Sequence, residues 1–414
     1  MKKNCFIFSF LFSFVFIVPK VGAEITLPAD MDNPGVDGDL AYVRGSVLPT
    51  TIDLDLAQQG VWNGGSGGNG IYDPDKWAVV FKYSSVNIES GFKINFSNHR
   101  SRAPIVWIVS GDVVIDGEIN LSGSSGRSGQ TYPEPGPGGF RGGSNAQASA
   151  PLSHGFGPGG GIGSGASTNA DTAIKGGCYK DTENCQSYGN DLILPLIGGS
   201  GGSGTDWGQG SSGGGGGGAI LIVATGKITI NGRILSLGGN AYANVGGSGG
   251  AIRLVADEIS GTGSLDVRTT TNSGGNGRIR IETNSMKEGL ETLPPIVPVN
   301  ISDTVLIWPP LNAPAVSILS VNQIQAPEDP VAGLLSIPDV LLSYTDQIEV
   351  LLATSYVASD GIVKVRYIPK NEPESEYFNA TYQSGPLENS IWEVTMPMNH
   401  DHVVLQAIAE NLEQ

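Results

Sequence analysis

The chain is poor in cysteine, histidine, basic residues and long apolar runs. It has three Cys, four His, and 23 Lys and Arg against 40 Asp and Glu, for a formal net charge of −17. This shortage of basic residues argues against a nucleic-acid partner, because phosphate contacts need a basic face. Beyond the first 23 residues no apolar run approaches the ~20 residues of a spanning helix, so we expect no transmembrane segment after that point.

The one long apolar run lies at the N-terminus. Two lysines open the chain, the apolar stretch Cys5 to Val18 follows, and the small residues Val21-Gly22-Ala23 come next. This order is typical of a secretory signal cleaved at about Ala23–Glu24. A retained membrane anchor is the alternative, but the run is short for one. We therefore expect residues 1–23 to be a signal peptide and the protein to be exported.

Two cysteines remain after cleavage, Cys178 and Cys185, in a polar stretch. In an oxidising compartment a close pair of this kind predicts one disulfide. A metal site is the competing interpretation, but two thiolates without a nearby His or a second Cys pair fall short of the four ligands of structural zinc.

A short β-type pattern recurs along the chain. Copies begin at Ile105, Ile220 and Ile252, and a truncated copy is Arg278 to Glu282. Such recurrence predicts a solenoid, in which no single unit buries its own apolar face. Equal spacing from the preceding glycine places Ile115 with Ile230, and Ile119 with Ile234, in one shared core. The dipeptides Asp116-Gly117 and Asn231-Gly232 occupy the same place in two copies, and Asx-Gly suits positive-φ turn positions at a corner.

Residues 123–218 hold about half of the 61 glycines, including six in a row at Gly213 to Gly218. A flexible or disordered linker is one interpretation of this composition. The other is an ordered insertion of extended, polyproline-II-like glycine segments laid against the solenoid. Glycine directly before the strands at Ala219 and Ala251 favours close backbone approach.

The composition changes after residue 283. Residues 284–312 are rich in proline, which predicts a semi-rigid linker after a glycine-rich domain of residues 24–283. Residues 313–414 are poor in glycine and alternate in short runs, as at Val316 to Leu319 and Trp392 to Met396. This spacing predicts an immunoglobulin-like β-sandwich, although the Cys…Trp…Cys pattern of true immunoglobulin domains is absent.

The repeats A-P-I-V-W-I-V-S-G-D-V-V-I-D-G-E-I-N-L-S-G and G-G-G-A-I-L-I-V-A-T-G-K-I-T-I-N-G resemble those of bacterial exported glycine-rich proteins. Those proteins are built on a right-handed parallel β-helix of pectate-lyase-like type, and an Ig-like module often follows. The resemblance covers roughly residues 80–283. It implies an all-β fold, a right-handed parallel β-helix followed by an Ig-like β-sandwich. It also implies export from a Gram-negative bacterium, to the periplasm, the cell surface or the medium, and it implies no reaction.

One acidic segment is a candidate metal site. Asp30, Asp32, Asp37 and Asp39 lie within ten residues around a Gly turn, which resembles a calcium loop. Pro34 stands where such a loop places a ligand, and no bidentate Glu follows, so a solvated acidic loop is the other interpretation. No other cofactor is expected.

The β-helix is also the scaffold of polysaccharide lyases and hydrolases, so an enzyme is the alternative function. Of the polygalacturonase motifs only Arg278-Ile279-Arg280 is approximated, and its Arg280 matches Arg253 of the previous copy as a repeated outward position. None of the four histidines has a recognisable catalytic neighbourhood. The pattern favours an exported structural or surface protein, adhesin-like, that binds a glycan or protein partner without catalysis.

Overall fold

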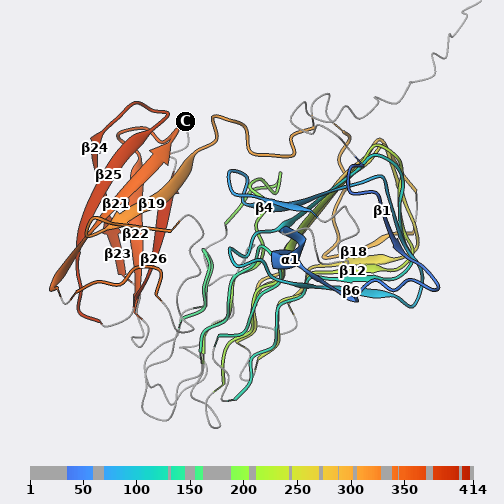
Figure 1. Ribbon diagram of the computed structural model, residues 1–414, viewed down its shortest axis with the longest axis horizontal. Helices are drawn as coiled ribbons and strands as arrows, with labels where there is room; N and C mark the ends of the chain where they lie inside the picture. Colours follow the sequence, from blue (N-terminus) through green and yellow to red (C-terminus); the bar gives the residue numbers. More distant parts are fainter. Residues whose placement is uncertain are drawn as a thin grey trace, which may run out of the picture.

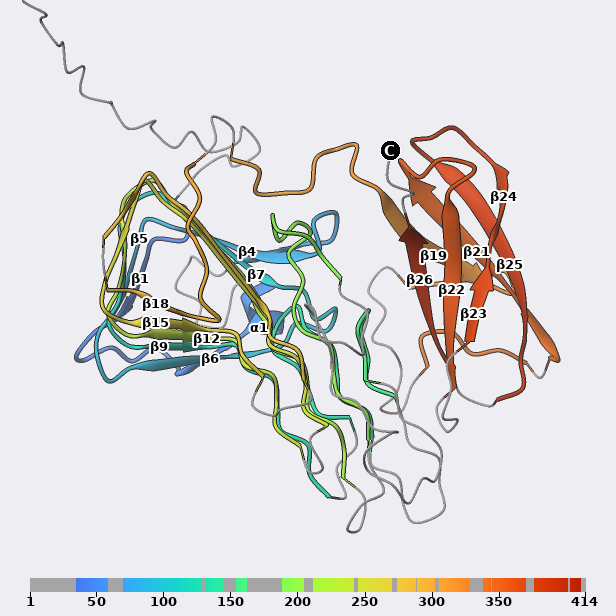
Figure 2. The same ribbon diagram turned by 180° about the vertical axis from the view of Figure 1, so that it is seen from behind.

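The computed structural model is nearly all β, and its one described helix is the five-residue α1 (Leu54–Gln58). The structure describes residues 35–58, 70–128, 132–144, 154–161, 188–204, 211–241, 245–269, 274–287, 289–301, 305–327, 338–343, 345–369, 376–400 and 403–410. Within these ranges no helix is long and apolar enough to cross a membrane. Figures 1 and 2 show the chain from opposite sides.

The strands up to residue 293 form three six-stranded sheets. Sheet A contains β1 (Asp39–Tyr42), β5 (Ser85–Ile88), β8 (Val113–Ile115), β11 (Ile228–Ile230), β14 (Glu258–Ser260) and β17 (Ser285–Met286). Sheet B contains β2 (Thr51–Asp53), β6 (Lys93–Ser97), β9 (Glu118–Asn120), β12 (Arg233–Leu235), β15 (Ser264–Asp266) and β18 (Glu291–Leu293). Sheet C contains β3 (Ile71–Asp73), β4 (Ala78–Tyr83), β7 (Ile105–Val109), β10 (Ala219–Ala224), β13 (Ala251–Val255) and β16 (Arg278–Glu282).

From β4 onward consecutive strands enter sheets C, A and B in turn, so that each three strands make one round. Every strand pair in these sheets is parallel except β3 with β4. The predicted repeats are register partners, because Ile220 pairs with both Ile105 and Ile252, and Ile252 pairs with Ile279. Figure 2 shows the traces of successive rounds lying one behind another.

One apolar core runs along the inside of the three sheets. Ile115 pairs with Ile230 and Ile119 with Ile234, and all four side chains are buried in the same cluster, as the repeats predict. The sheets begin before the first repeat, since β1 and β2 pair with β5 and β6. The alternation of Val86 to Phe96 predicts an opening pair of strands, where β5 and β6 lie, and Thr51 to Leu54 has some strand character, where β2 lies. The four-residue strand β1 carries no such signal.

Sheet C is buried on both faces, which explains the continuous apolar runs of its strands. In β7, Ile105, Trp107 and Val109 face the inner core, whereas Val106 and Ile108 belong to a second buried cluster on the outer side. That outer cluster is completed by side chains from residues 193–196 and 305–307. Arg253 and Arg280, which are register partners, lie on this outer side. The side chain of Arg253 is buried rather than exposed to solvent.

The described parts of the glycine-rich insertion are ordered and largely buried. Residues 211–218 are buried throughout and form no regular strand. Their N–H groups donate to carbonyl groups in three neighbouring segments in strict rotation. Ser212, Gly215 and Gly218 donate to residues 127, 124 and 121; Gly213, Gly216 and Ala219 to residues 143, 140 and 137; Gly214 and Gly217 to residues 245 and 248.

The direction of the N–H groups thus repeats every three residues, which is the period of the polyproline II helix. That helix has no internal hydrogen bonds. Its N–H and C=O groups are therefore free to bond to neighbouring chains. A Cβ atom added at Gly213, Gly214 or Gly216 would lie far inside contact distance of a backbone oxygen. For these described residues the ordered interpretation of the insertion holds, and we call residues 211–218 with their bonded neighbours the glycine bundle.

Part of the proline-rich stretch, residues 284–312, continues the three sheets. β17 and β18 add the last strands to sheets A and B, and Val299 forms an isolated bridge with Glu282 beside β16. Ile296 packs against the inner core, and Val305 and Ile307 are buried on the outer side of sheet C. Much of the stretch expected as a linker therefore packs against the three sheets.

The C-terminal residues form two antiparallel sheets. One contains β19 (Ala315–Val321), β20 (Ile324–Gln325), β21 (Gln347–Ser355), β24 (Thr381–Ser384) and β25 (Ser390–Pro397). The other contains β22 (Ile362–Pro369), β23 (Glu376–Asn379) and β26 (Val403–Glu410). Side chains from both sheets, including Val350, Val365 and Trp392, share one buried cluster.

Candidate binding surface on sheet B

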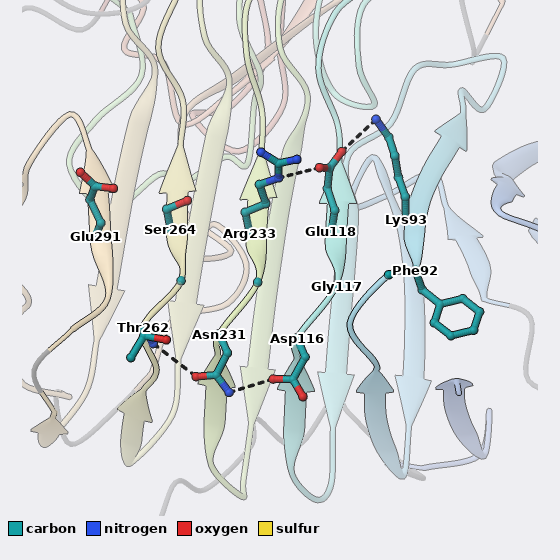
Figure 3. Close-up of a pocket in the computed structure, with 13 residues that line it drawn as sticks. Phe92, Lys93, Asp116, Gly117, Glu118, Asn231, Arg233, Thr262, Ser264 and Glu291 are labelled. Carbon is teal, nitrogen blue, oxygen red and sulfur yellow. Dashed lines mark hydrogen bonds and ion pairs between the residues drawn. The ribbon is translucent and has the colours of Figure 1, made fainter. Parts of the chain in front are cut away.

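An elongated polar pocket of about 510 Å³ lies on the outer side of sheet B, where its strands begin. Neighbouring strands of a sheet are ~4.8 Å apart, so side chains at equal register form rows across it. Figure 3 shows two rows here. One consists of Lys93, Glu118, Arg233, Ser264 and Glu291, and the other of Asp116, Asn231 and Thr262. We call this surface the ladder pocket.

The first row is held by charge. The Glu118 carboxylate forms an ion pair with Lys93 Nζ at 2.8 Å and accepts a hydrogen bond from Arg233 Nε at 2.6 Å. Burial raises the pKa of Glu118, but the hydrogen bonds and charges of the two cations outweigh burial and lower that pKa. The side chains of Lys93 and Arg233 remain 51% and 60% exposed, so both cations are available to a ligand.

The second row is held by amide hydrogen bonds. Asn231 Nδ2 donates to Asp116 Oδ1 at 2.8 Å, and Asn231 Oδ1 accepts from the N–H of Thr262 at 3.3 Å. The glycines that follow do not have the positive φ expected of a turn. A Cβ at Gly232 would collide with the carbonyl oxygen of Gly117, so this glycine permits close stacking of successive rounds. The positive φ predicted for these two glycines is therefore wrong, although both lie in a corner between two strands, as predicted.

A second pocket, of about 450 Å³, lies where the strands of sheet B end. The loop after β6, the chain after β9 and residues 134–141 of the glycine-rich insertion meet there. Arg141 Nε donates to Glu134 Oε1 at 2.7 Å, and Arg102 Nε lies 3.4 Å from Glu134 Oε2. The side chains of Arg102 and Arg141 are 15% and 8% exposed, against 43% for Glu134. We call this site the arginine pocket.

Burial and charge compete at these groups. Burial lowers the pKa of Arg102, and the negative charges of Glu134 and Asp339 only partly oppose it. Burial raises the pKa of Glu134, but the charges and hydrogen bonds of the two arginines lower it overall. Arg102 nevertheless keeps its charge at neutral pH, because the pKa of a guanidinium group lies far above that range before burial lowers it.

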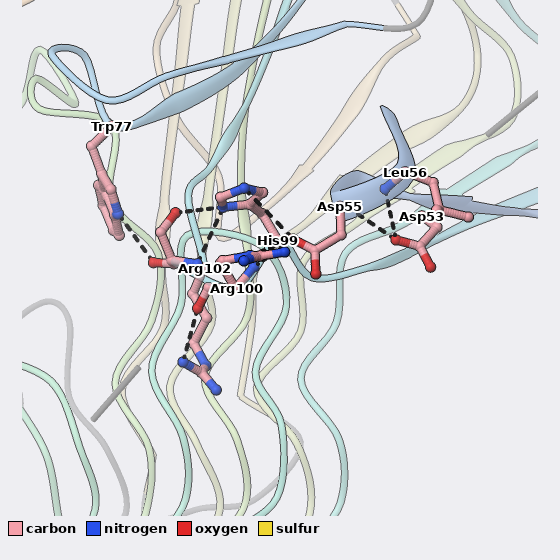
Figure 4. Close-up of polar contacts among 8 residues, drawn as sticks. Asp53, Asp55, Leu56, Trp77, His99, Arg100 and Arg102 are labelled. Atoms are coloured by element: carbon pink, nitrogen blue, oxygen red, sulfur yellow. Dashed lines mark hydrogen bonds and ion pairs between the residues drawn. The ribbon is translucent and has the colours of Figure 1, made fainter. Parts of the chain in front are cut away.

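The loop that carries Arg102 is anchored by a buried histidine (Figure 4). His99 Nδ1 lies 2.7 Å from Ser101 Oγ, and His99 Nε2 lies 3.6 Å from Asp55 Oδ1. Serine, histidine and aspartate are the three residue types of a catalytic triad. However, the backbone N–H of Ser101 also donates to Nδ1, at 3.1 Å, and the ring is fully buried against Tyr72. The group therefore fits a loop anchor better than a nucleophile with its base.

The two pockets belong to one face. The ladder pocket includes Lys93 at the start of β6 and the arginine pocket includes Ser97 at its end, both on the face opposite the inward-facing Ile94 and Phe96. Between them Asn120 Nδ2 donates to Asn95 Oδ1 at 3.2 Å. Polar side chains therefore run from one pocket to the other along and across the strands of sheet B.

The predicted calcium ligands are only partly placed. Asp37 Oδ2 accepts from the backbone N–H of Lys82 at 2.6 Å, and Asp39 Oδ1 accepts from Ser85 Oγ at 2.7 Å. Asp30 and Asp32 lie outside the described residues, so the four-carboxylate site remains a prediction. Among described residues no three His, Cys, Asp or Glu side chains cluster as metal ligands. Cys178 and Cys185 also lie outside the described residues.

Sequence reasoning missed both pockets. For the ladder pocket a signal existed, because Glu118 and Arg233 each follow the matched Asx-Gly pair of their repeat. For the arginine pocket there was none, since Glu134 and Arg141 lie in the glycine-rich insertion, which lacks the repeat. Comparison of the chain with family models, curated proteins and solved structures gives no match.

Proposed function

We propose that this is an exported, non-enzymatic surface protein that binds an extended glycan in the ladder pocket. In this proposal the three parallel sheets form a right-handed parallel β-helix, and the C-terminal sheets form an Ig-like sandwich. The rotation of consecutive strands through sheets C, A and B supports the first assignment. The shared core of the two antiparallel sheets supports the second.

The observation that carries the binding proposal is the pair of rows in the ladder pocket. A sugar polymer presents hydroxyl groups at regular intervals, and a stacked sheet presents side chains at ~4.8 Å intervals across its strands. Amide, hydroxyl and charged groups from five neighbouring strands meet this requirement together. Few of the side chains in the rows are apolar, so the pocket is unsuited to the apolar anchors of a typical protein interface.

The charge pairing favours binding over hydrolysis. Glycoside hydrolysis needs one carboxyl group with a raised pKa as general acid. In Glu118 the neighbouring cations lower the pKa instead. A polysaccharide lyase or glycoside hydrolase nevertheless remains the alternative function. Release of shorter saccharides from a bound polysaccharide would distinguish it from binding alone.

The test uses the mature chain, residues 24–414, on a glycan array, with dissociation constants measured for the glycans that bind. Asn231→Ala and the double variant Lys93→Gln/Arg233→Gln should weaken binding about tenfold or more, because each removes hydrogen bonds to the ligand. Lys287→Gln, which removes one positive charge beside sheet A, is the matched control and should bind as wild type.

Circular dichroism melts of each variant show whether weaker binding reflects unfolding. Absence of binding to any glycan, or binding that all ladder variants retain, would contradict the proposal. Incubation with the bound polysaccharides, with and without calcium, tests the alternative. Release of shorter saccharides would show an enzyme.

A further inference from the structure

The geometry points to the arginine pocket as an anion subsite that binds a carboxylate or sulfate ester group of the glycan. This inference rests on the proposed function and adds the class of ligand, an anionic glycan that extends from the ladder pocket. It depends on the charge balance of the pocket, its neutral lining and its position on sheet B.

The charge balance of the pocket is unusual for so acidic a chain. Three arginines line it, Arg100, Arg102 and Arg141, against the carboxylate of Glu134 among the described lining residues, and Arg100 Nε also lies 3.6 Å from Asp55 Oδ1 beside the pocket. The formal charge of the whole chain is −17, so a positively lined pocket on it is a local exception. Guanidinium groups present a planar set of donors that matches carboxylate and sulfate oxygens in pairs.

The arginines are held in place before any ligand arrives. Arg141 is buried and donates to Glu134 at 2.7 Å. Arg102 has a positive φ of 55° and its N–H donates to the carbonyl of His99 at 2.8 Å. A left-handed backbone at a non-glycine residue costs energy, and such residues are common at ligand sites. The buried His99 anchor therefore fixes a cationic side chain at the pocket.

The neutral groups of the pocket suit a sugar. Asn120, Ser122 and Ser124 supply amide and hydroxyl groups. Asn98 donates to the carbonyl of Pro135 at 2.8 Å, while its own Oδ1 is buried without a hydrogen bond among described residues. An acidic peptide would satisfy the arginines equally, but this lining favours hydroxyl-rich ligands, so the peptide becomes an outcome of the test.

A carboxylate of the chain itself already acts on the site. The charge of Asp339, in residues 338–343, raises the pKa of Arg102 as Glu134 does. Glu134, whose Oε2 lies 3.4 Å from Arg102 Nε, therefore competes with an external anion for the same guanidinium. Removing the Glu134 charge should tighten binding of an anionic ligand, which a purely structural role for the arginines does not predict.

The experiment measures the affinity of the mature chain for three hexasaccharides. They are mannuronate (carboxylate), κ-carrageenan (sulfate ester) and neoagarose (neutral). We expect at least one anionic probe to bind about tenfold more tightly than the neutral one, with an affinity that falls as salt is added. The two anionic arms separate carboxylate from sulfate recognition.

Variants that should change the affinity for an anion in opposite directions make the test more specific. Arg102→Gln should weaken anion binding about tenfold, and Arg141→Lys should weaken it less, because the charge stays and the paired donors go. Glu134→Gln should tighten anion binding several-fold while lowering thermal stability, since two buried cations lose their partner. Lys287→Gln is the charge-matched control and should change neither quantity beyond the general effect of salt.

Several outcomes would overturn the inference. They are equal affinity for all three probes, an unchanged anion affinity in Arg102→Gln with a normal melt, or weaker anion binding in Glu134→Gln. Neutral probes that still depend on the ladder pocket would then leave the proposed function standing. Binding of none of the probes, with a synthetic peptide of residues 336–343 bound instead, would show a peptide site.

Discussion

The three sheets and the glycine bundle bury their chains by opposite means. Inside the sheets, large apolar side chains such as Ile230 and Trp107 fill the space and the backbone bonds sideways to the next round. In the bundle there is almost no side chain, and the segment 211–218 is enclosed by other backbones on three sides. Sheets gain stability from apolar area removed from water, whereas the bundle depends on satisfied backbone groups and close contact.

The comparison teaches that the same residue type has different meanings in the two regions. Glycine weakens an ordinary strand because it has no side chain to pack. In the bundle a side chain is excluded where backbones touch, because a Cβ at Gly216 would occupy the space of the Gly199 carbonyl oxygen. Low hydrophobicity therefore does not imply disorder where backbone groups can bond to several neighbours.

The largest expected effect comes from a charge in the side-chain core. Ile230→Asp places an unpaired carboxylate among fully buried apolar groups and should cost about 4 kcal/mol or more, enough to abolish the cooperative melt of the three sheets. Thr229→Asp is the control, since its half-buried side chain is on the other face of the same strand, and we expect a cost below ~1 kcal/mol. An unchanged thermal midpoint for Ile230→Asp would show that the Ile230 side chain does not lie in this core.

A single added methyl group should suffice to disrupt the glycine bundle. Gly216→Ala forces its chain away from that of Gly199 and should cost about 2 to 4 kcal/mol, with loss of amide protection in residues 211–218 by hydrogen exchange. Gly45→Ala tests for a general glycine effect. Nothing lies within 4 Å of its added Cβ, so only its φ of +92° matters, at ~1 kcal/mol. Equal costs in the two variants would show that the bundle is loosely packed.

A smaller effect depends on pH and belongs to the outer surface of the sheets. The fold lowers the pKa of Glu118 below 4.5, so its ionised form stabilises the fold above that value and the contribution is lost as the pH falls. Urea unfolding between about pH 5 and pH 3 should therefore show less loss of stability in Glu118→Gln than in wild type. Lys93→Gln/Arg233→Gln should reduce the loss similarly. A wild-type pH profile in both variants would contradict the pairing.

The smallest expected effect on the melt of the three sheets is that of the cysteine pair. If Cys178 and Cys185 form the predicted disulfide, they close a small ring, and reduction should cost at most a few kcal/mol within that ring. We expect the melt of the three sheets to change little on reduction, because the described strands of these sheets do not include residues 178–185. Two thiols that react with iodoacetamide in the non-reduced exported protein would exclude the bridge.

Much of the strand arrangement could be predicted because one repeat carries both apolar pattern and register. Ile105, Ile220 and Ile252 each open a buried strand, and the spacing within their repeats is enough to place Ile115 beside Ile230. The glycine bundle offered no such signal, since glycine-rich composition is shared by linkers and by packed backbones. Only the three-residue rotation of its hydrogen bonds separates the two, and this depends on neighbours distant in sequence.

The candidate site was less predictable for the same reason. Glu118 and Arg233 are 115 residues apart and meet because the chain after the insertion re-enters the sheets in register with the strands before it. Their pairing follows from the repeat once that register is known. Arg102 and Arg141 meet through a positive-φ loop and a glycine-rich segment, neither of which has a period that alignment could use.

The threefold rotation of hydrogen bonds in residues 211–218 acts like a reading frame. Deleting one glycine moves each later residue into the position of the one before it, so Ala219 would take the direction of Gly218 and β10 would enter sheet C a third of a turn out of direction. Deleting three restores each direction and shortens the segment by one helical turn. Glycine-rich segments of this kind can therefore lengthen or shorten in evolution by threes, whereas single insertions are out of frame although every codon still encodes glycine.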